Sequence, residues 1–161
     1  MMKKNILVFL LLLSYFSLFS QSTNSKWSDL FSYNNVLAFK EKDGKIIAAT
    51  ENGVFYYNTI SGEITKLSKA NGLHEVKISA FDYDAATNTA IIGYKSGNLD
   101  VVTADGVTYV VDIPLSQSYT GSKTINNISI NGDKAVISVG YGVSIFNITK
   151  KEFGDTCFFF N

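Results

Sequence analysis

The sequence comprises 161 residues with 14 basic and 14 acidic side chains, so its formal net charge is zero. This balance excludes the clustered excess of lysine and arginine that grips nucleic acid, and no nucleic-acid partner is expected. Apolar residues make up 46% of the chain and aromatic residues 14%, which excludes a disordered tail and predicts one globular unit.

The first segment, MMKKNILVFLLLLSYFSLFSQS, joins two lysines to an apolar run that begins at Ile6 and ends near the small residue Ser20. This pattern is typical of a secretory signal peptide over residues 1–20, cleaved after Ser20. A single transmembrane anchor is the alternative, because the apolar stretch approaches the length that spans a bilayer. Small polar residues follow the run and no basic stop-transfer cluster does, which favours cleavage. We therefore expect an exported protein whose mature part is residues 21–161.

Helical periodicity is hard to find after residue 33, whereas short runs of Val, Ile, Tyr, Phe and Thr recur between Gly, Asn, Asp and Ser, as strands do. Three of these runs align: GKIIAATENGVFYYN (44–58), NTAIIGYKSGNLDVV (88–102) and DKAVISVGYGVSIFN (133–147). The alignment puts Gly53, Gly97 and Gly142 in one column, at spacings of 44 and 45 residues. A short hairpin turn needs a residue that accepts a positive φ, so we expect these structural repeat glycines in three hairpin turns.

Each of these hairpins has a further strand-like run on either side. The runs ahead of it are 34–43, 77–84 and 125–132, and the runs behind it are 63–68, 106–112 and a third from about residue 152. Four strands in about 44 residues is the content of a β-propeller blade. An all-β sandwich is the alternative, but it does not predict a glycine at a fixed phase. The predicted fold class is therefore all-β, a partial β-propeller with blades over about 34–76, 77–124 and 125–161.

The second strand of each unit reads IIAA, AIIG or AVISV, and such continuous apolar runs indicate strands covered on both faces. A propeller blade lies between two neighbours in this way. Small residues in these strands would let the facing sheets approach closely; they are Ala48, Ala49, Gly93 and Ser138.

Three blades are fewer than a propeller needs, because propellers close with four to eight. An open arc would leave one blade face bare at each end. About five uncovered apolar side chains, at roughly 1.5 to 3 kcal/mol each, would forgo on the order of 10 kcal/mol, which is comparable to the stability of a whole domain. We therefore expect an incomplete, truncated propeller: the N-terminal piece of a longer protein or the product of a broken reading frame. An oligomer of arcs is the other arrangement.

Two of the units, KDGKIIAATENGVFYYN and GDKAVISVGYGVSIFN, resemble the repeat of two-component regulator propellers. Thr50 and Gly53 match the apolar strand that ends in Thr and the glycine that follows it. The chain has IIAAT where that repeat commonly has Trp-Ile-Gly-Thr. This resemblance implies a periplasmic, ligand-sensing propeller of a hybrid two-component regulator.

A second resemblance covers most of the chain after the leader. Its segments are, in order, WSDLFSYNNV (27–36), KLSKANGL (66–73), IIGYKSGNLDVV (91–102), SKTINNI (122–128) and GVSIFNITKKEFGDT (142–156). They resemble the N-terminal propeller of the PorZ family, which belongs to the type IX secretion system of Bacteroidetes, and the match stops at CFFFN. The resemblance implies a non-enzymatic component of the surface attachment complex, in the periplasm or at the outer-membrane-associated cell surface. It further implies two partners, the sortase PorU and the anionic lipopolysaccharide to which that sortase joins secreted cargo, but it places no ligand-binding residue on this sequence.

The side chains themselves predict no catalytic, cofactor-binding or metal-binding set. The one histidine, His74, would need a nucleophile beside it in a cleft to act as a base, so a solvated loop histidine is expected. Asp82 and Asp84 in DYDAATN lack the further Gly and Glu of a calcium loop, and we expect them to satisfy a turn. The single cysteine, Cys157, excludes an intrachain disulfide and lies in a segment expected to be irregular. No enzyme activity and no cofactor are therefore expected.

The aromatic run Phe55, Tyr56 and Tyr57 alternates across a predicted strand. Blade packing is the expected role for it, and a sugar-stacking platform is the alternative. A cofactor-binding propeller enzyme would need converging polar residues on the channel face, which the three blades do not show.

Overall fold

The computed structural model describes residues 30–117 and 121–159, and the leader predicted for residues 1–20 lies outside them. Within the described residues, no helix is both long enough and apolar enough to be a membrane span.

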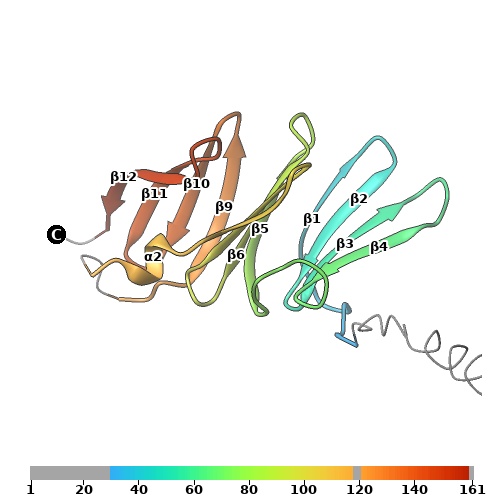
Figure 1. The fold of residues 1–161 in the computed structure, drawn as a ribbon, viewed down its shortest axis with the longest axis horizontal. Helices are drawn as coiled ribbons and strands as arrows, with labels where there is room; N and C mark the ends of the chain where they lie inside the picture. The colour runs from blue at the N-terminus through green and yellow to red at the C-terminus, as the bar shows by residue number, and fades with distance from the viewer. Residues whose placement is uncertain (1–29, 118–120, 160–161) are drawn as a thin grey trace, which may run out of the picture.

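The described chain forms three four-stranded antiparallel sheets that follow one another along the sequence (Figure 1). Blade 1 consists of β1 (Val36–Lys42), β2 (Lys45–Thr50), β3 (Gly53–Asn58) and β4 (Ile64–Ser68). Blade 2 consists of β5 (Ile78–Asp84), β6 (Thr89–Tyr94), β7 (Leu99–Thr103) and β8 (Gly106–Val110). Blade 3 consists of β9 (Ile125–Asn131), β10 (Lys134–Val139), β11 (Gly142–Asn147) and β12 (Glu152–Phe158). The predicted all-β class with three four-stranded blades is confirmed, and the sequence did not predict the short helix α2 (Asp112–Leu115).

The three sheets stand side by side as an open arc rather than stacking as a sandwich (Figure 1). The first strand of blade 2, β5, contacts β1 on one side and β9 on the other. Two apolar clusters fill the spaces between the sheets. Between blades 1 and 2 the buried residues include Ile47, Val54, Ile78, Phe81 and Ile92. Between blades 2 and 3 they include Ile91, Leu99, Val101, Ile125, Ile137 and Phe146.

The second strands are covered on both faces in blade 2 but not in blade 3. β6 is buried along its whole length, as its continuous apolar run predicts. In β10, by contrast, Val136 is 40% exposed, because it points to the face of blade 3 that lies away from blade 2. The prediction of two covered faces is therefore wrong for β10.

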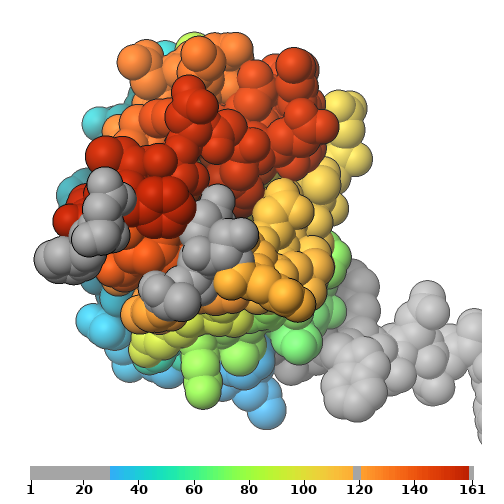
Figure 2. Space-filling view, turned by 90° about the vertical axis from the view of Figure 1, so that its left-hand side faces the viewer, coloured from blue at the N-terminus to red at the C-terminus, as the bar shows by residue number. Residues whose placement is uncertain are grey.

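Neither outer face of the arc has a further sheet against it among the described residues, and the two faces differ in polarity. Tyr33 lies against the face of blade 1, edge-on to Phe55. On blade 1 the register places Phe39, Ala48 and Phe55 in one row across the face opposite blade 2, and Phe39 is 64% exposed. The next row holds Ile46, Tyr57 and Ile64, so this face is mostly apolar, with the charged residues Glu41 and Lys66 on its two outer strands. The corresponding face of blade 3 alternates apolar and polar side chains: Asn127, Ser129, Val136, Ser138, Val143 and Ile145. Figure 2 looks onto the blade 3 end of the arc, with the segment that holds α2 beside the strands.

Asp82 joins the three sheets where their first strands meet. The residue lies in β5 and is 6% exposed. Its Oδ2 accepts a hydrogen bond from the Ile130 backbone N–H of β9 at 2.7 Å, and its Oδ1 lies 2.9 Å from Lys40 Nζ of β1. The expectation that Asp82 satisfies a turn is therefore wrong. Asp84 does satisfy one, because its carboxylate accepts hydrogen bonds from the Ala86 backbone and the Thr87 hydroxyl.

Asp82→Asn should lower the free energy of unfolding by about 2 kcal/mol, because a neutral amide replaces the charged acceptor that β1 and β9 share. Urea unfolding followed by circular dichroism measures this change. Asp84→Asn is the matched variant, since it alters a carboxylate two residues along in an exposed turn, and it should change stability by about 0.5 kcal/mol. Equal effects of the two variants would contradict the role of Asp82 in linking β1, β5 and β9.

Candidate functional site

One end of the arc carries the segments that lead from each blade to the next, and we call it the loop end. It consists of residues 69–77, 111–117 and 121–124, together with the short β2–β3, β6–β7 and β10–β11 turns, and it lies at the bottom of Figure 1. Hydrogen bonds link neighbouring blades here, from the Ile78 N–H to Glu51 O between blades 1 and 2, and from the Thr124 hydroxyl before blade 3 to Lys95 O of blade 2. The most densely bonded group of polar side chains lies at this end.

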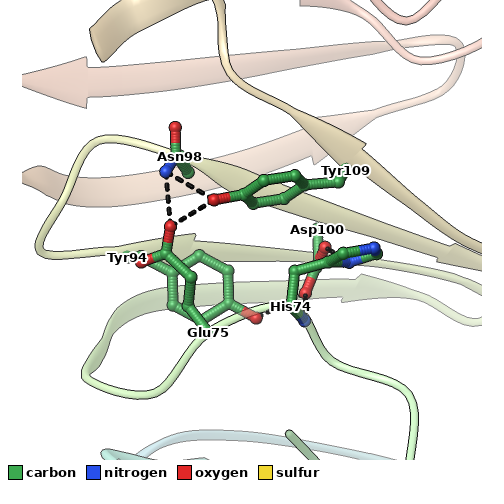
Figure 3. Close-up of polar contacts among 6 residues, drawn as sticks. All are labelled: His74, Glu75, Tyr94, Asn98, Asp100 and Tyr109. Carbon is green, nitrogen blue, oxygen red and sulfur yellow. Dashed lines mark hydrogen bonds and ion pairs between the residues drawn. The ribbon is translucent and has the colours of Figure 1, made fainter.

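A buried carboxylate, Asp100 of β7, holds the segment that contains His74 (Figure 3). Asp100 is fully buried and accepts the His74 backbone N–H at 2.9 Å. Its Oδ1 lies 2.7 Å from His74 Nδ1, and because a carboxylate only accepts, Nδ1 donates. The hydroxyl of Tyr94, which is also fully buried, donates to Oδ2 at 2.5 Å. His74 lies in a loop with its side chain 42% exposed, as expected of a solvated loop histidine, but the sequence did not predict that Asp100 of β7 bonds its ring.

A second carboxylate, Glu75, extends the cluster toward the β6–β7 turn (Figure 3). It accepts hydrogen bonds from the Tyr109 hydroxyl and the Asn98 side-chain amide, and from the Ser96 hydroxyl at 2.7 Å. The rings of His74 and Tyr109 stack at 4.5 Å with an interplanar angle of 10°. This stacking joins the two carboxylates and their donors into one network.

The protonation states of the cluster follow from its burial and its charges. Burial raises the pKa of Tyr94 far above its usual value, and the carboxylate of Asp100 adds to the effect. Burial and the adjacent Glu75 raise the pKa of Tyr109 to about 12. Burial also raises the pKa of Glu75, but the hydrogen bonds from Tyr109, Asn98 and Ser96 lower it by more. The pKa of Glu75 therefore lies below its usual value. At neutral pH both tyrosines are donors and Glu75 is an ionised acceptor.

This arrangement fastens a loop, and in the described residues it does not pair His74 with a nucleophile. Ser96 donates to Glu75, and no serine, threonine or cysteine of the described residues is hydrogen-bonded to His74, so no activated nucleophile is formed there. The described residues also contain no group of three or more His, Cys, Asp or Glu side chains placed to hold a metal ion. What the cluster does is hold residues 73–75 against blade 2. The one sequence feature that indicates this polar cluster is the single charged residue, Asp100, in the apolar run LDVV.

Glu75→Gln should make stability less sensitive to acid. The pKa of Glu75 is lower in the folded chain than its ordinary value of 4.5. Ionised Glu75 therefore contributes stability above that value, and the contribution is lost as the pH falls through the folded pKa. Urea midpoints between about pH 7 and pH 3 should fall less steeply for the variant than for the parent. Other carboxylates titrate in both proteins, so the measurement is the difference between the two curves. Superimposable curves would contradict the lowered pKa of Glu75.

The three repeat glycines lie at the same hairpin of each blade for two different reasons. Gly97 lies within the β6–β7 turn and has a φ of 94°, as the hairpin argument requires. Gly53 and Gly142 begin β3 and β11 without a positive φ, so that argument is wrong for them. A Cβ on Gly53 would lie 2.8 Å from Leu67 O, and a Cβ on Gly142 would lie 2.2 Å from Cys157 O. At these two positions the neighbouring strand leaves no room for a side chain.

The strand register explains why Gly97 differs. Ala49 pairs with Val54 in blade 1, five residues on, whereas Gly93 pairs with Leu99 in blade 2, six residues on. The β6–β7 turn is therefore one residue longer than the β2–β3 turn. Asn98, rather than Gly97, occupies the place that Gly53 has in blade 1.

The remaining residues singled out in the sequence lie in strands. Cys157 is an exposed free thiol within β12, so the expectation of an irregular segment there is wrong. Tyr56 packs against the cluster between blades 1 and 2, which agrees with blade packing. Phe55 and Tyr57 point to the outer face of blade 1 instead.

The sheets and their inter-blade clusters define the chain as a β-propeller module. The family model described as the TSS9, PorZ, N-terminal beta-propeller domain matches residues 46–160, and the chain belongs to this family. No curated protein matches the chain.

Solved structures share this fold at low sequence identity. PorZ of Porphyromonas gingivalis, titled an essential bacterial surface component of the type IX secretion system, is 22% identical with a TM-score of 0.71, over 81% of this chain. The extracellular domain of the putative one component system BT4673 of B. thetaiotaomicron is 15% identical with a TM-score of 0.62, over 83% of this chain. The RRP9 WD40 repeats are 13% identical with a TM-score of 0.64, over 80% of this chain and 40% of theirs. The chain spans 18% of the length of each of the first two structures.

Proposed function

We propose that the chain is a non-catalytic binding and scaffold module of an exported protein that supports type IX secretion. Membership of the PorZ N-terminal propeller family over residues 46–160 carries this proposal. The loop end adds physical support, because the buried Asp100 fixes the loop around His74 against blade 2. A fixed loop loses little conformational freedom when a partner binds, which favours affinity. The module acts in the periplasm or at the outer-membrane-associated cell surface.

In this proposal the module works beside the sortase PorU, which attaches secreted cargo to anionic lipopolysaccharide, and the lipopolysaccharide is a candidate ligand. Deleting the gene in the bacterium that carries it should release cargo into the medium with its C-terminal signal uncleaved. The unmodified gene should restore surface attachment, and a gene with Asp100→Ala should restore less at equal protein level. Attachment that is unchanged by the deletion would overturn the proposal.

The second candidate is the sensor propeller of a hybrid two-component regulator. Thr50 and Gly53 match the repeat of those regulators, and the BT4673 structures show that such proteins contain this fold. The DNA downstream of codon 161 distinguishes the candidates. The resemblance to the PorZ family implies two propellers and a C-terminal sandwich domain in the full-length protein, so these domains downstream support the secretion role. A transmembrane helix followed by a kinase core supports the sensor.

We propose that residues 1–20 direct export and are removed, leaving the blade units 34–76, 77–124 and 125–161 within the exported part. N-terminal sequencing of the exported protein should then begin at Gln21. An exported form that begins at Met1 would instead indicate a retained membrane anchor. The lysines near the start and the apolar run from Ile6 to Ser20 support this reading.

A further inference from the structure

A groove between blades 1 and 2 opens at the end of the arc opposite the loop end. Two adjoining hollows form it, with volumes of about 310 and 330 Å³. Both are lined by Lys45, Ile47, Tyr83 and Asn88. The first hollow continues along Tyr56, Glu63 and Thr65, and the second along Lys42 and Asp43. Strands of both neighbouring blades line the groove, so it exists without any further blade.

Two tyrosines and an isoleucine make the deepest part of the groove apolar. Ile47 is 4% exposed. Tyr56 in β3 and Tyr83 in β5 are half-buried, and burial raises the pKa of each. The Tyr83 hydroxyl donates to Asn88 Oδ1 at 2.8 Å, which fixes the ring. Rigid tyrosines beside asparagine amides supply contact area at little entropic cost, and binding surfaces for polypeptides are rich in them.

The rim of the groove carries polar groups that have no protein partner. Among the described residues, the side chains of Lys45, Glu63 and Thr65 make no hydrogen bond or ion pair, and Lys42 makes no ion pair. The loop end is the contrast, because Glu75 there has three donors. Lys42 has the carboxylates of Asp43 and Asp84 near it, so the unpaired ammonium group of Lys45 is the one that favours an acidic group on the ligand. Ile47, between strands that carry the two tyrosines, offers aliphatic contact that suits an aliphatic or aromatic side chain, and a sugar ring stacked on one tyrosine is the alternative outcome of the test.

We propose that this groove binds an extended peptide that places an apolar side chain between Tyr56 and Tyr83 and an acidic side chain beside Lys45. The Thr65 hydroxyl and the Asn88 amide are available to hydrogen-bond the peptide backbone. Because the walls are strands of packed sheets, the groove is formed before the peptide arrives. Peptide binding in this groove goes beyond the secretion role and depends on different residues. Either proposal can therefore be wrong while the other holds.

The repeat provides matched control variants. Thr65 pairs with Tyr56, and its counterpart Thr108 pairs with Val101 on the outer strand of blade 2. Thr65→Trp fills the groove, whereas Thr108→Trp places the same ring on an equivalent exposed strand position. Likewise Lys45 and Lys134 are the first residues of β2 and β10 and pair with Asn58 and Asn147. Lys45→Glu reverses the charge at the groove, and Lys134→Glu reverses it elsewhere.

The test is a selection of short random peptides displayed on phage against the purified chain, followed by fluorescence anisotropy with the selected peptides. We expect peptides that combine an apolar and an acidic residue, with affinity reduced about tenfold or more by Thr65→Trp and Lys45→Glu. Thr108→Trp and Lys134→Glu should bind like the parent. Circular dichroism and urea midpoints establish that all four variants fold.

Three results would overturn the proposal. They are a selection that yields no peptide, peptides that bind Thr65→Trp as well as the parent, and binding of soluble oligosaccharides that Thr65→Trp abolishes while no peptide binds. The last result would assign the groove to a sugar. Lys45→Glu changes only an exposed charge and leaves the packing intact. A loss of peptide binding in this variant is therefore not caused by misfolding.

Discussion

Replacing Asp100 with alanine is expected to lower the free energy of unfolding by about 2 to 4 kcal/mol, because hydrogen bonds to a charged acceptor contribute about 1.5 to 3 kcal/mol. Asp100 is fully buried and accepts from the His74 backbone, the His74 ring and the Tyr94 hydroxyl. Alanine leaves the buried Tyr94 hydroxyl without its acceptor, which adds its own desolvation penalty. Since a whole domain is stable by only about 5 to 15 kcal/mol, this one change removes a large share of its stability.

Thermal and urea unfolding measure the effect of Asp100→Ala, and the melting temperature should fall by roughly 10 °C. Asp155→Asn is the control, because Asp155 lies exposed in β12 and should change stability by less than about 0.5 kcal/mol. Tyr94→Phe removes one donor and leaves both His74 contacts, so its effect should be smaller, about 1 to 2 kcal/mol. Equal stability of Asp100→Ala and the control would show that the cluster does not hold the loop end.

Gly93→Val is expected to destabilise the chain by about 3 kcal/mol through overpacking between blades 2 and 3. Gly93 lies in β6, and a Cβ there would be 2.5 Å from Ile125 Cγ2 and 2.7 Å from Ile125 Cβ of β9. Ile125 is fully buried, and its backbone carbonyl accepts a hydrogen bond from the Ser79 hydroxyl at 2.7 Å, so it has little freedom to move. The φ of Gly93 is not positive, so the effect is steric rather than conformational.

A compensating substitution makes the steric explanation testable. Ile125→Ala removes the Cγ1 and Cγ2 atoms that the new side chain would meet and keeps only the Cβ contact. The double variant should therefore be more stable than the sum of the two single effects predicts, by about 1 kcal/mol. Gly154→Ala is the control, because a Cβ there would lie 3.6 Å from the nearest atom, Ile145 O. Additive losses in the double variant would rule out the contacts with Ile125 Cγ1 and Cγ2 as the cause.

Much of the fold could be predicted because it depends on local patterns. Strands alternate with turn residues along the whole described chain, and strand pairing within each blade follows the sequence order without crossovers. The close approach at Gly93 could also be anticipated, since only a small residue fits between two covered sheets. The expectations that were wrong concern contacts between one blade and the next. Asp82 was assigned to its own turn, but its partners are Lys40 of β1 and Ile130 of β9.

The polar cluster at the loop end shows the same limit. Its two carboxylates are 25 residues apart in the sequence, and His74 meets Asp100 only because the loop after blade 1 folds back over β7. No spacing in the sequence encodes that contact. The groove between Tyr56 and Tyr83 likewise combines side chains from two blades.

The sequence by itself determined the all-β class, the three blades and the family, because periodic apolar runs and repeated glycines are properties of neighbouring residues. The tertiary structure alone decided which charged side chains are buried and paired, which glycines are needed for space rather than for φ, and where a groove opens. The physical reason is that burial and hydrogen bonding depend on which surfaces face each other after the sheets pack. Blade-to-blade packing brings together residues from separate repeats, and their pairing is set by the geometry of the arc.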